Sequence, residues 1–153
     1  MEQGVNNHYT RLFIMVAVHF IAMYALMYSM VNVFDNLFHN FNQFYMAGLM
    51  TASMGVIEIA LMGSMYYNKK LNAFIAGVSI VALAAFFIFI RQQTAVSDIQ
   101  FVRSMIPHHS GAILMCEEAS ITDPELKKLC EEIIANQQAE ISQMKVILSR
   151  LEK

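Results

Sequence analysis

Charge, proline and glycine are all scarce in this sequence, and tryptophan is absent. Charged side chains make up 14% of the 153 residues, beside 2 prolines and 6 glycines. A soluble domain carries about a quarter charged residues, so this composition argues against an ordinary soluble protein. The net charge of −2 provides no basic surface for phosphates, which argues against a nucleic-acid partner. With few helix-breaking residues and no alternating β pattern, the sequence predicts an all-α fold.

Motifs of the common enzyme classes are also missing. The chain contains no Gly-rich phosphate loop, no His-Glu-X-X-His helix and no Ser-His-Asp set. No cleavable signal pattern is present either, because the first apolar run is longer than a signal core and no small-residue cleavage site follows it. We therefore expect a protein that is not an enzyme and has no catalytic residues or organic cofactor.

The few charges are distributed unevenly along the chain. Residues 12–90 contain four charged side chains, whereas residues 91–153 contain 7 basic and 9 acidic ones. We therefore expect an apolar domain at residues 1–91 and a charged domain at residues 92–153.

Three apolar runs reach the roughly 20 residues that a helix needs to cross a bilayer. They cover residues 12–33, 44–65 and 71–90. Because a single segment inside lipid can satisfy its backbone only as a helix, the sequence predicts three transmembrane helices. Three buried helices of a soluble protein are the alternative.

Lysine and arginine in short loops indicate the orientation of such helices. Arg11 precedes the first run, and Lys69 and Lys70 lie between the second and the third. This pattern predicts a multi-pass protein of the bacterial inner membrane, with a cytoplasmic N-terminus and a periplasmic or extracellular C-terminal domain. Arg91 argues the other way.

The charged domain has the pattern of a helical hairpin. Ser97 with Gln100 forms a possible capping box ahead of a helix over residues 98–120. Thr122 with Glu125 forms another, and Pro124 suits the first turn of a second helix, which continues to Leu151.

Both helices of the hairpin have an apolar stripe with the alternating spacing of a coiled-coil seam. The predicted stripes are Phe101, Met105, His108, Ala112, Met115 and Ala119 on the first helix, and Leu126, Cys130, Ile133, Gln137, Glu140, Met144, Ile147 and Leu151 on the second. The first helix has more apolar surface than one partner helix can cover. We therefore expect a homo-oligomer in which a second hairpin completes a four-helix bundle.

Folding the hairpin about its turn brings polar residues of both stripes to one level. His108 would lie opposite Gln137, and Met105 opposite Glu140. The residues that could converge there are Met105, His108, His109, Gln137, Glu140 and Met144. Thioether and imidazole ligands together favour copper, as Cu(I) or Cu(II), and zinc is a further possibility. The alternative is a methionine-rich core with one buried polar layer, since the chain has 13 methionines.

Two motifs in the hairpin carry a family resemblance. They are Met105-Ile106-Pro107-His108-His109 with Gly111-Ala112-Ile113 and Met115, and Asp123-Pro124-Glu125-Leu126 followed by Ile133-Ile134-Ala135, Gln137-Gln138-Ala139-Glu140-Ile141 and Met144. This tail resembles a bacterial domain-of-unknown-function family, number three hundred and five, which includes CopM-like copper-binding proteins. The resemblance implies a ferritin-like helical bundle, copper binding and copper tolerance. It maps the family's metal positions onto Met105, His108, His109, Met115 and Met144.

The chain departs from that family pattern in its three membrane runs and in Cys116 and Cys130. These two cysteines would face each other near the turn. Outside the cytoplasm a disulfide is the first expectation, and a second soft-metal site is the alternative.

Two ionisable residues, His19 and Glu58, lie inside the first and second apolar runs at similar expected depth. Such residues indicate either a structural pair or a transport site. The leading hypothesis is a membrane-anchored copper protein for storage, tolerance or handover. A structural oligomerisation module, a small transporter and a thiol redox protein are the rivals.

Overall fold

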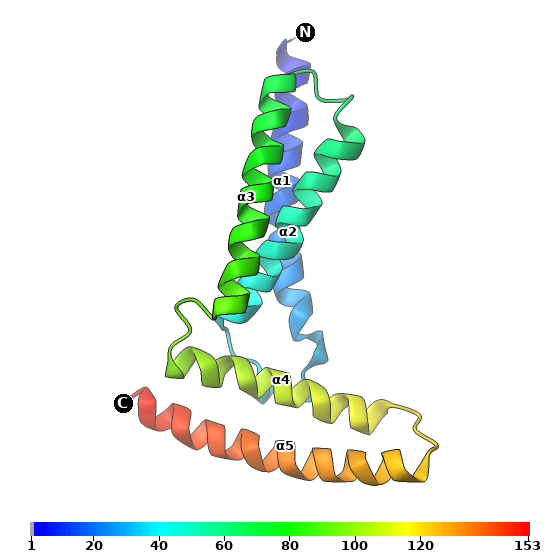
Figure 1. The fold of residues 1–153 in the computed structure, drawn as a ribbon, viewed down its shortest axis with the longest axis vertical. Coiled ribbons are helices and arrows are strands. Elements are labelled where there is room, and N and C mark those ends of the chain that lie inside the picture. The colour runs from blue at the N-terminus through cyan, green and yellow to red at the C-terminus, as the bar shows by residue number, and fades with distance from the viewer. Residues whose placement is uncertain (1) are drawn as a thin grey trace. The chain divides into compact units, whose positions relative to one another are not determined.

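The computed structural model describes the backbone of residues 2–153 and the side chains of residues 8–153. Over this range every regular element is helical, which confirms the predicted all-α fold. The elements are α1 (Glu2–Leu26), the short 3-10 helices η1 (Met27–Met30) and η2 (Phe34–Asn36), α2 (Phe41–Met62), α3 (Lys69–Gln92), α4 (Asp98–Glu118) and α5 (Pro124–Leu151) (Figure 1).

The chain forms two compact units that differ from the predicted domains in one respect. One unit comprises residues 1–26 and 42–94, and the other comprises residues 27–41 and 95–153. The segment that follows α1 therefore belongs with the hairpin. The α-helix within the apolar run predicted at 12–33 ends at Leu26. The residues that follow form the 3-10 helix η1, which contacts α4.

Three helices, which lie mostly in the first unit, are long and apolar enough to cross a membrane. The candidate spans are His8–Met30, Phe41–Met62 and Lys69–Gln92, with mean hydropathies of 2.0, 1.5 and 2.7. Many of their large apolar side chains are exposed, including Phe13, Val18, Leu61, Phe74 and Val81. Exposed apolar surface of this extent is typical of contact with lipid or with another protein.

Small residues allow close packing inside this unit. A Cβ atom at Gly48 would lie 2.5 Å from the Phe86 ring, and one at Gly55 would lie 2.8 Å from Ser79 Oγ. The α2 and α3 helices therefore approach each other where a larger residue would not fit. The hydroxyl of Tyr9 donates to Asn72 Oδ1 over 2.7 Å, which joins α1 to α3.

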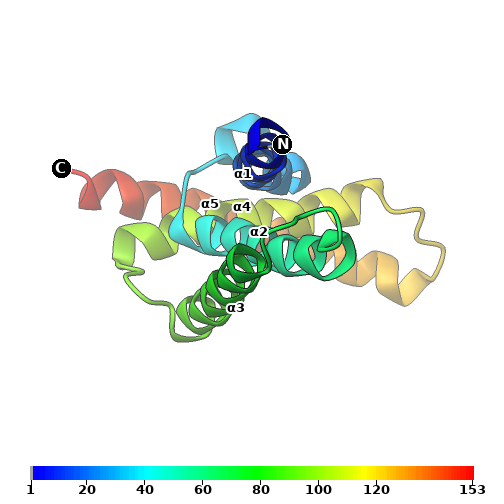
Figure 2. The same cartoon turned by 90° about the horizontal axis from the view of Figure 1, so that it is seen from above.

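The second unit is built on the hairpin of α4 and α5, which run antiparallel and side by side (Figure 1, Figure 2). Ser97 caps α4 as predicted, since its side chain accepts a hydrogen bond from the Gln100 amide. The cap of α5 is Asp123, whose Oδ1 accepts from the Leu126 amide over 2.8 Å, and Pro124 follows it. The predicted cap at Thr122 is therefore wrong by one residue.

Replacing the α5 cap should measurably weaken the hairpin. We expect Asp123→Ala to lower the free energy of unfolding of the hairpin by about 1 kcal/mol, because the Leu126 amide loses its acceptor. Thr122→Ala, one residue earlier and exposed, is the matched control and should change it by less than about 0.5 kcal/mol. Hydrogen exchange of the α5 amides in the full chain measures both values. Equal effects of the two changes would contradict this assignment of the cap.

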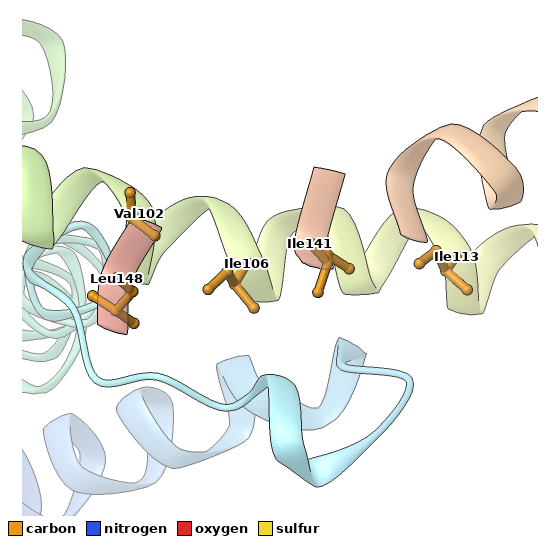
Figure 3. Close-up of a cluster of buried hydrophobic side chains, with 5 residues drawn as sticks. All are labelled: Val102, Ile106, Ile113, Ile141 and Leu148. Carbon is orange, nitrogen blue, oxygen red and sulfur yellow. The ribbon is translucent and has the colours of Figure 1, made fainter. Parts of the chain in front are cut away.

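The hairpin has one apolar core. Its buried side chains are Val102, Ile106 and Ile113 from α4, and Ile141 and Leu148 from α5 (Figure 3). Ile106, Ile113 and Ile141 are at most 1% exposed. The α4 stripe that faces α5 therefore contains Val102, Ile106 and Ile113, each one residue after a member of the predicted stripe. Phe101, which belongs to the predicted stripe, is 52% exposed.

Residues 27–41 pack on α4 through a small polar network. The Ser110 hydroxyl, fully buried, accepts from the Asn32 amide over 2.8 Å and donates to Asn32 Oδ1 over 2.5 Å. Asn36 donates to Asn32 Oδ1 over 3.0 Å. Next to these contacts, a Cβ at Gly111 would lie 3.4 Å from the Met30 carbonyl oxygen. This polar contact joins segments that are far apart in the sequence, and no pattern in the sequence predicts it.

Candidate metal centre

The centre of the hairpin holds a histidine–carboxylate pair. His109 on α4 is 9% exposed, and its Nε2 lies 2.7 Å from Oε2 of Glu140 on α5. Its other ring nitrogen, Nδ1, lies 2.9 Å from the carbonyl oxygen of Met105, one turn earlier. The sequence predicts Met105 opposite Glu140, but the residue in hydrogen-bond contact with that carboxylate is His109.

Two methionines flank this pair. Met105 stands four residues before His109, and Met144 stands four residues after Glu140, so each shares a helix face with its partner in the pair. In an antiparallel hairpin equal steps along both helices keep residues level, so Met105 and Met144 occupy the next level. Both are half-buried, and Met144 packs against the hairpin core.

Gln137 supplies a further oxygen atom about one helical turn nearer the hairpin turn than Glu140. It lies on α5 three residues before Glu140, on the same helix face. Its Oε1 is buried and has no hydrogen-bond partner among the described residues. An orphaned buried acceptor is costly unless a donor or cation reaches it.

The remaining residues predicted for this site lie outside it. His108 is exposed, with its ring centroid 6.0 Å from that of His109. Met115 is 55% exposed and lies nearer the turn. Among the described residues, no group of three or more His, Cys, Asp or Glu side chains is placed to hold a metal. A metal at this level would therefore need sulfur or amide ligands beside His109 and Glu140.

Cys116 and Cys130 do lie together, as the predicted register requires. Both are free thiols in the structure. Interaction with the Cys130 side chain, with burial second, raises the pKa of Cys116 to about 11. Because the thiolate is the reactive form, this thiol is a poor nucleophile at neutral pH, which disfavours a thiol redox role.

The polar residues inside the apolar runs have different partners from those expected. Glu58 accepts a hydrogen bond from the Tyr66 hydroxyl over 2.9 Å. In the part of the chain with described side chains, Glu58 makes no ion pair or hydrogen bond with His19. Tyr66, which lies in the connection between α2 and α3, has no signal in the sequence that would identify it as the partner of Glu58.

Two comparisons with known proteins found similar sequences. Residues 89–148 match the domain of unknown function DUF305. Over 147 residues the chain is 34% identical to an uncharacterized protein of Acanthamoeba polyphaga mimivirus, covering 94% of this chain and 93% of that one. No solved structure matches the chain. The alignment to the viral protein therefore includes most of the apolar part that precedes the DUF305 domain.

Proposed function

The chain belongs to the same family as the mimivirus protein and carries a DUF305 domain, and from that premise we propose that it is a membrane-anchored copper-binding protein. Its copper ligands would be His109, Met105 and Met144, with Glu140 and Gln137 as oxygen donors. The role that fits such a site is storage, tolerance or handover of copper at one membrane face.

The hydrogen-bond inventory of His109 carries this proposal. A carbonyl oxygen can only accept, so His109 Nδ1 must be the donor to the Met105 carbonyl. In a neutral imidazole Nε2 then has a lone pair, and it lies 2.7 Å from a carboxylate oxygen, which is also an acceptor. A proton shared by the two atoms accounts for this short contact, and a metal ion bound by both groups could take the place of that proton. Histidines that ligate metals characteristically donate the other ring N–H to a backbone carbonyl, as His109 does.

The donor set favours copper among the available metals. Zinc sites use nitrogen, oxygen and thiolate ligands and four-coordinate geometry, and no third His, Cys, Asp or Glu stands with His109 and Glu140 in the described residues. Thioethers select Cu(I), and Met105 and Met144 flank the pair. When bound, copper would take the place of the proton that His109 and Glu140 share. The chain's own residues would bind and shield it.

A titration of the full chain with Cu(I) tests this proposal. We expect the reduced protein in detergent, with Cys116→Ser and Cys130→Ser, to take one Cu(I) from a competing chelator. Met105→Leu with Met144→Leu keeps the packing volume but removes both sulfurs, so Cu(I) affinity should fall at least tenfold while helix content is retained. An unchanged affinity in that variant, or no Cu(I) uptake by the parent, would reject the site.

The membrane anchor is the second part of the proposal. It is supported by the three apolar helices and their exposed apolar side chains. The positive residues Arg11, Lys69 and Lys70 favour a cytoplasmic N-terminus with the hairpin on the opposite side.

The exposed face of the hairpin favours an additional role in assembly. On α4, one residue before each position of the seam with α5, a second stripe lies about 100° around the helix; it contains Phe101, Met105, His108, Ala112 and Met115. The corresponding stripe on α5, also one residue before the seam positions, contains Leu129, Ile133, Glu140 and Ile147. Because the helices are antiparallel, these stripes lie on one side of the hairpin. Phe101, Met115 and Leu129 are 52%, 55% and 48% exposed.

We propose that a second copy of the chain, packed antiparallel, covers this face. The turn end of the hairpin is mainly acidic, whereas the other end has an excess of basic side chains, so antiparallel packing pairs opposite charges. Near the turn the acidic residues Glu117, Glu118, Asp123, Glu125, Glu131 and Glu132 outnumber Lys127 and Lys128. At the other end Arg103, Lys145, Arg150 and Lys153 outnumber Asp98 and Glu152, and Arg103 pairs with Glu152 over 2.7 Å.

A charge introduced into the exposed face should separate the two copies. We expect the full chain in detergent to be a dimer by light scattering and Phe101→Asp to be a monomer, because a carboxylate would be buried without a partner. Val146→Asp is the matched control, since Val146 is 72% exposed on the other side of α5. A parent protein that is monomeric at all concentrations would exclude this arrangement.

A further inference from the structure

A shallow groove lies along the end of α5 that is farthest from the hairpin turn. It has a volume of about 360 Å³, and all of its lining belongs to the hairpin unit. Leu148 is a buried residue of the hairpin core, and Phe38 packs against that core. Apolar and charged side chains therefore meet in this groove, whose lining residues are Phe38, Lys145, Leu148, Ser149, Glu152 and Lys153.

The charge of this groove is positive. Among the described side chains, neither Lys145 nor Lys153 forms an ion pair, whereas the Glu152 carboxylate lies 2.7 Å from Arg103 Nη2. Arg103 thus compensates the acidic residue of the lining, and the two lysine charges are left uncompensated. Lysine ammonium groups bind phosphate as point charges, so the groove suits a phosphate group.

The position of Phe38 in the chain places the groove near a membrane surface, given the membrane anchor proposed above. The candidate spans His8–Met30 and Phe41–Met62 leave only residues 31–40 between them. Phe38 is three residues before Phe41, and a chain extends at most about 3.5 Å per residue, so Phe38 lies within roughly 10 Å of the start of that span. The headgroup layer on each side of a bilayer is roughly 5–8 Å thick. The groove beside Phe38 is therefore within reach of lipid headgroups.

The connection between the two spans also exposes apolar side chains. Phe34 is 88% exposed and Val33 is 50% exposed. At a bilayer, side chains of this kind enter the boundary between headgroups and acyl chains. Their exposure favours a lipid over a free anion as the source of the phosphate group.

We propose that this groove binds the headgroup of an anionic phospholipid. Lys145 and Lys153 bind the phosphate, the Ser149 hydroxyl donates to one of its oxygens, and Phe38 contacts the glycerol end of the acyl chains. A lipid with a net negative charge is preferred to a zwitterionic one, because a choline headgroup brings a cation of its own to the two lysines.

The second copy proposed above leaves this groove open. Ser149 follows the seam residue Leu148, whereas Ile147 of the dimer face precedes it, so Ser149 and Ile147 lie on opposite sides of the seam. The lipid site therefore rests on the proposed membrane anchor, but it depends neither on copper nor on the dimer.

Binding of short-chain lipids to the full chain in a nonionic detergent, measured by isothermal titration calorimetry, tests the groove. The probes are dioctanoyl phosphatidylglycerol, dioctanoyl phosphatidylcholine and inorganic phosphate. We expect the parent protein to bind phosphatidylglycerol at least about fivefold more tightly than phosphatidylcholine. Lys145→Gln with Lys153→Gln should weaken phosphatidylglycerol binding at least about tenfold, since each lysine near a lipid surface contributes roughly fivefold.

Lys127→Gln with Lys128→Gln is the matched control, because it removes the same charge from two exposed residues near the turn. It should weaken phosphatidylglycerol binding by less than about twofold. Circular dichroism checks that both double variants keep the helix content of the parent. The lipid preference of the parent tests the proposal independently of the variants.

Three results would overturn the proposal. One is equal affinity of the parent for the two lipids. Another is an equal loss of phosphatidylglycerol binding in the two folded double variants. The third is inorganic phosphate that binds as tightly as phosphatidylglycerol, which would assign the groove to a free anion. Failure of the membrane anchor would look different, because the chain would then stay in solution without detergent, and failure of the copper site would leave lipid binding unchanged.

Discussion

His109→Ala is expected to lower the Cu(I) affinity of the full chain at least about 100-fold, measured by chelator competition in the background that lacks both cysteines. Loss of an outer partner of a metal ligand alone costs about 10–100-fold in affinity, and this change removes a ligand itself. It also removes the contact of 2.7 Å that positions the Glu140 carboxylate, so the site loses one ligand and the fixed position of a second. The effect should therefore exceed that of either methionine.

His108→Ala provides the matched control for this experiment. The two histidines are adjacent, but His108 is exposed whereas His109 is in contact with Glu140. We expect His108→Ala to change the Cu(I) affinity of the full chain less than about threefold. If both variants lose Cu(I) affinity equally, the copper ligands include His108, as the stripe predicted from the sequence requires. If only His108→Ala loses affinity, the proposed site is wrong.

Glu140→Gln separates the charge of the carboxylate from its position. The amide can donate to the lone pair of His109 Nε2, so the apo hairpin should keep its stability. Copper binding should weaken because the site then lacks the negative charge that balances the ion. A higher affinity in this variant would contradict the argument that a metal ion takes the place of the proton between the two side chains.

The sequence was sufficient to predict the fold class, the three apolar helices and the hairpin. Each follows from local signals: apolar runs, the Ser97 cap, and the proline after the turn. The choice between His108 and His109 is different, because neighbouring residues differ by only about 100° on a helix. Both stripes of α4 are apolar enough to form the seam, so periodicity alone leaves the two arrangements open.

Contacts between distant segments decide that choice. Ser110 is buried because it bonds to Asn32, far away in the sequence, and this contact covers one side of α4. The side that remains for α5 then includes Ile106 and His109. Short polar residues such as Asn32 and Ser110 are common in turns and on surfaces, so their pairing has no periodic signal. The partner of Glu58 was missed for the same reason.

Ile106→Ala is expected to have the largest effect on stability. The Ile106 side chain is 0% exposed and packs with the buried residues of both hairpin helices. Truncation of a fully buried isoleucine costs about 2–5 kcal/mol, since transfer energy is lost and a cavity remains. Single domains are stable by about 5–15 kcal/mol in total, so this one change removes a large share. Hydrogen exchange of the α4 and α5 amides in the full chain measures it.

Val146→Ala is the matched control, because it also changes a β-branched residue to alanine within a helix and its side chain is 72% exposed. It should alter the free energy of unfolding of the hairpin by no more than about 0.5 kcal/mol.

Phe101→Ala distinguishes the two possible seams between α4 and α5. If α5 packed on the stripe predicted from the sequence, Phe101→Ala would be the severe change and Ile106→Ala the mild one. The opposite order is expected, because the same rotation of α4 that buries Ile106 also brings His109 to Glu140. A mild Ile106→Ala would therefore remove the basis of the copper site together with that of the hairpin core.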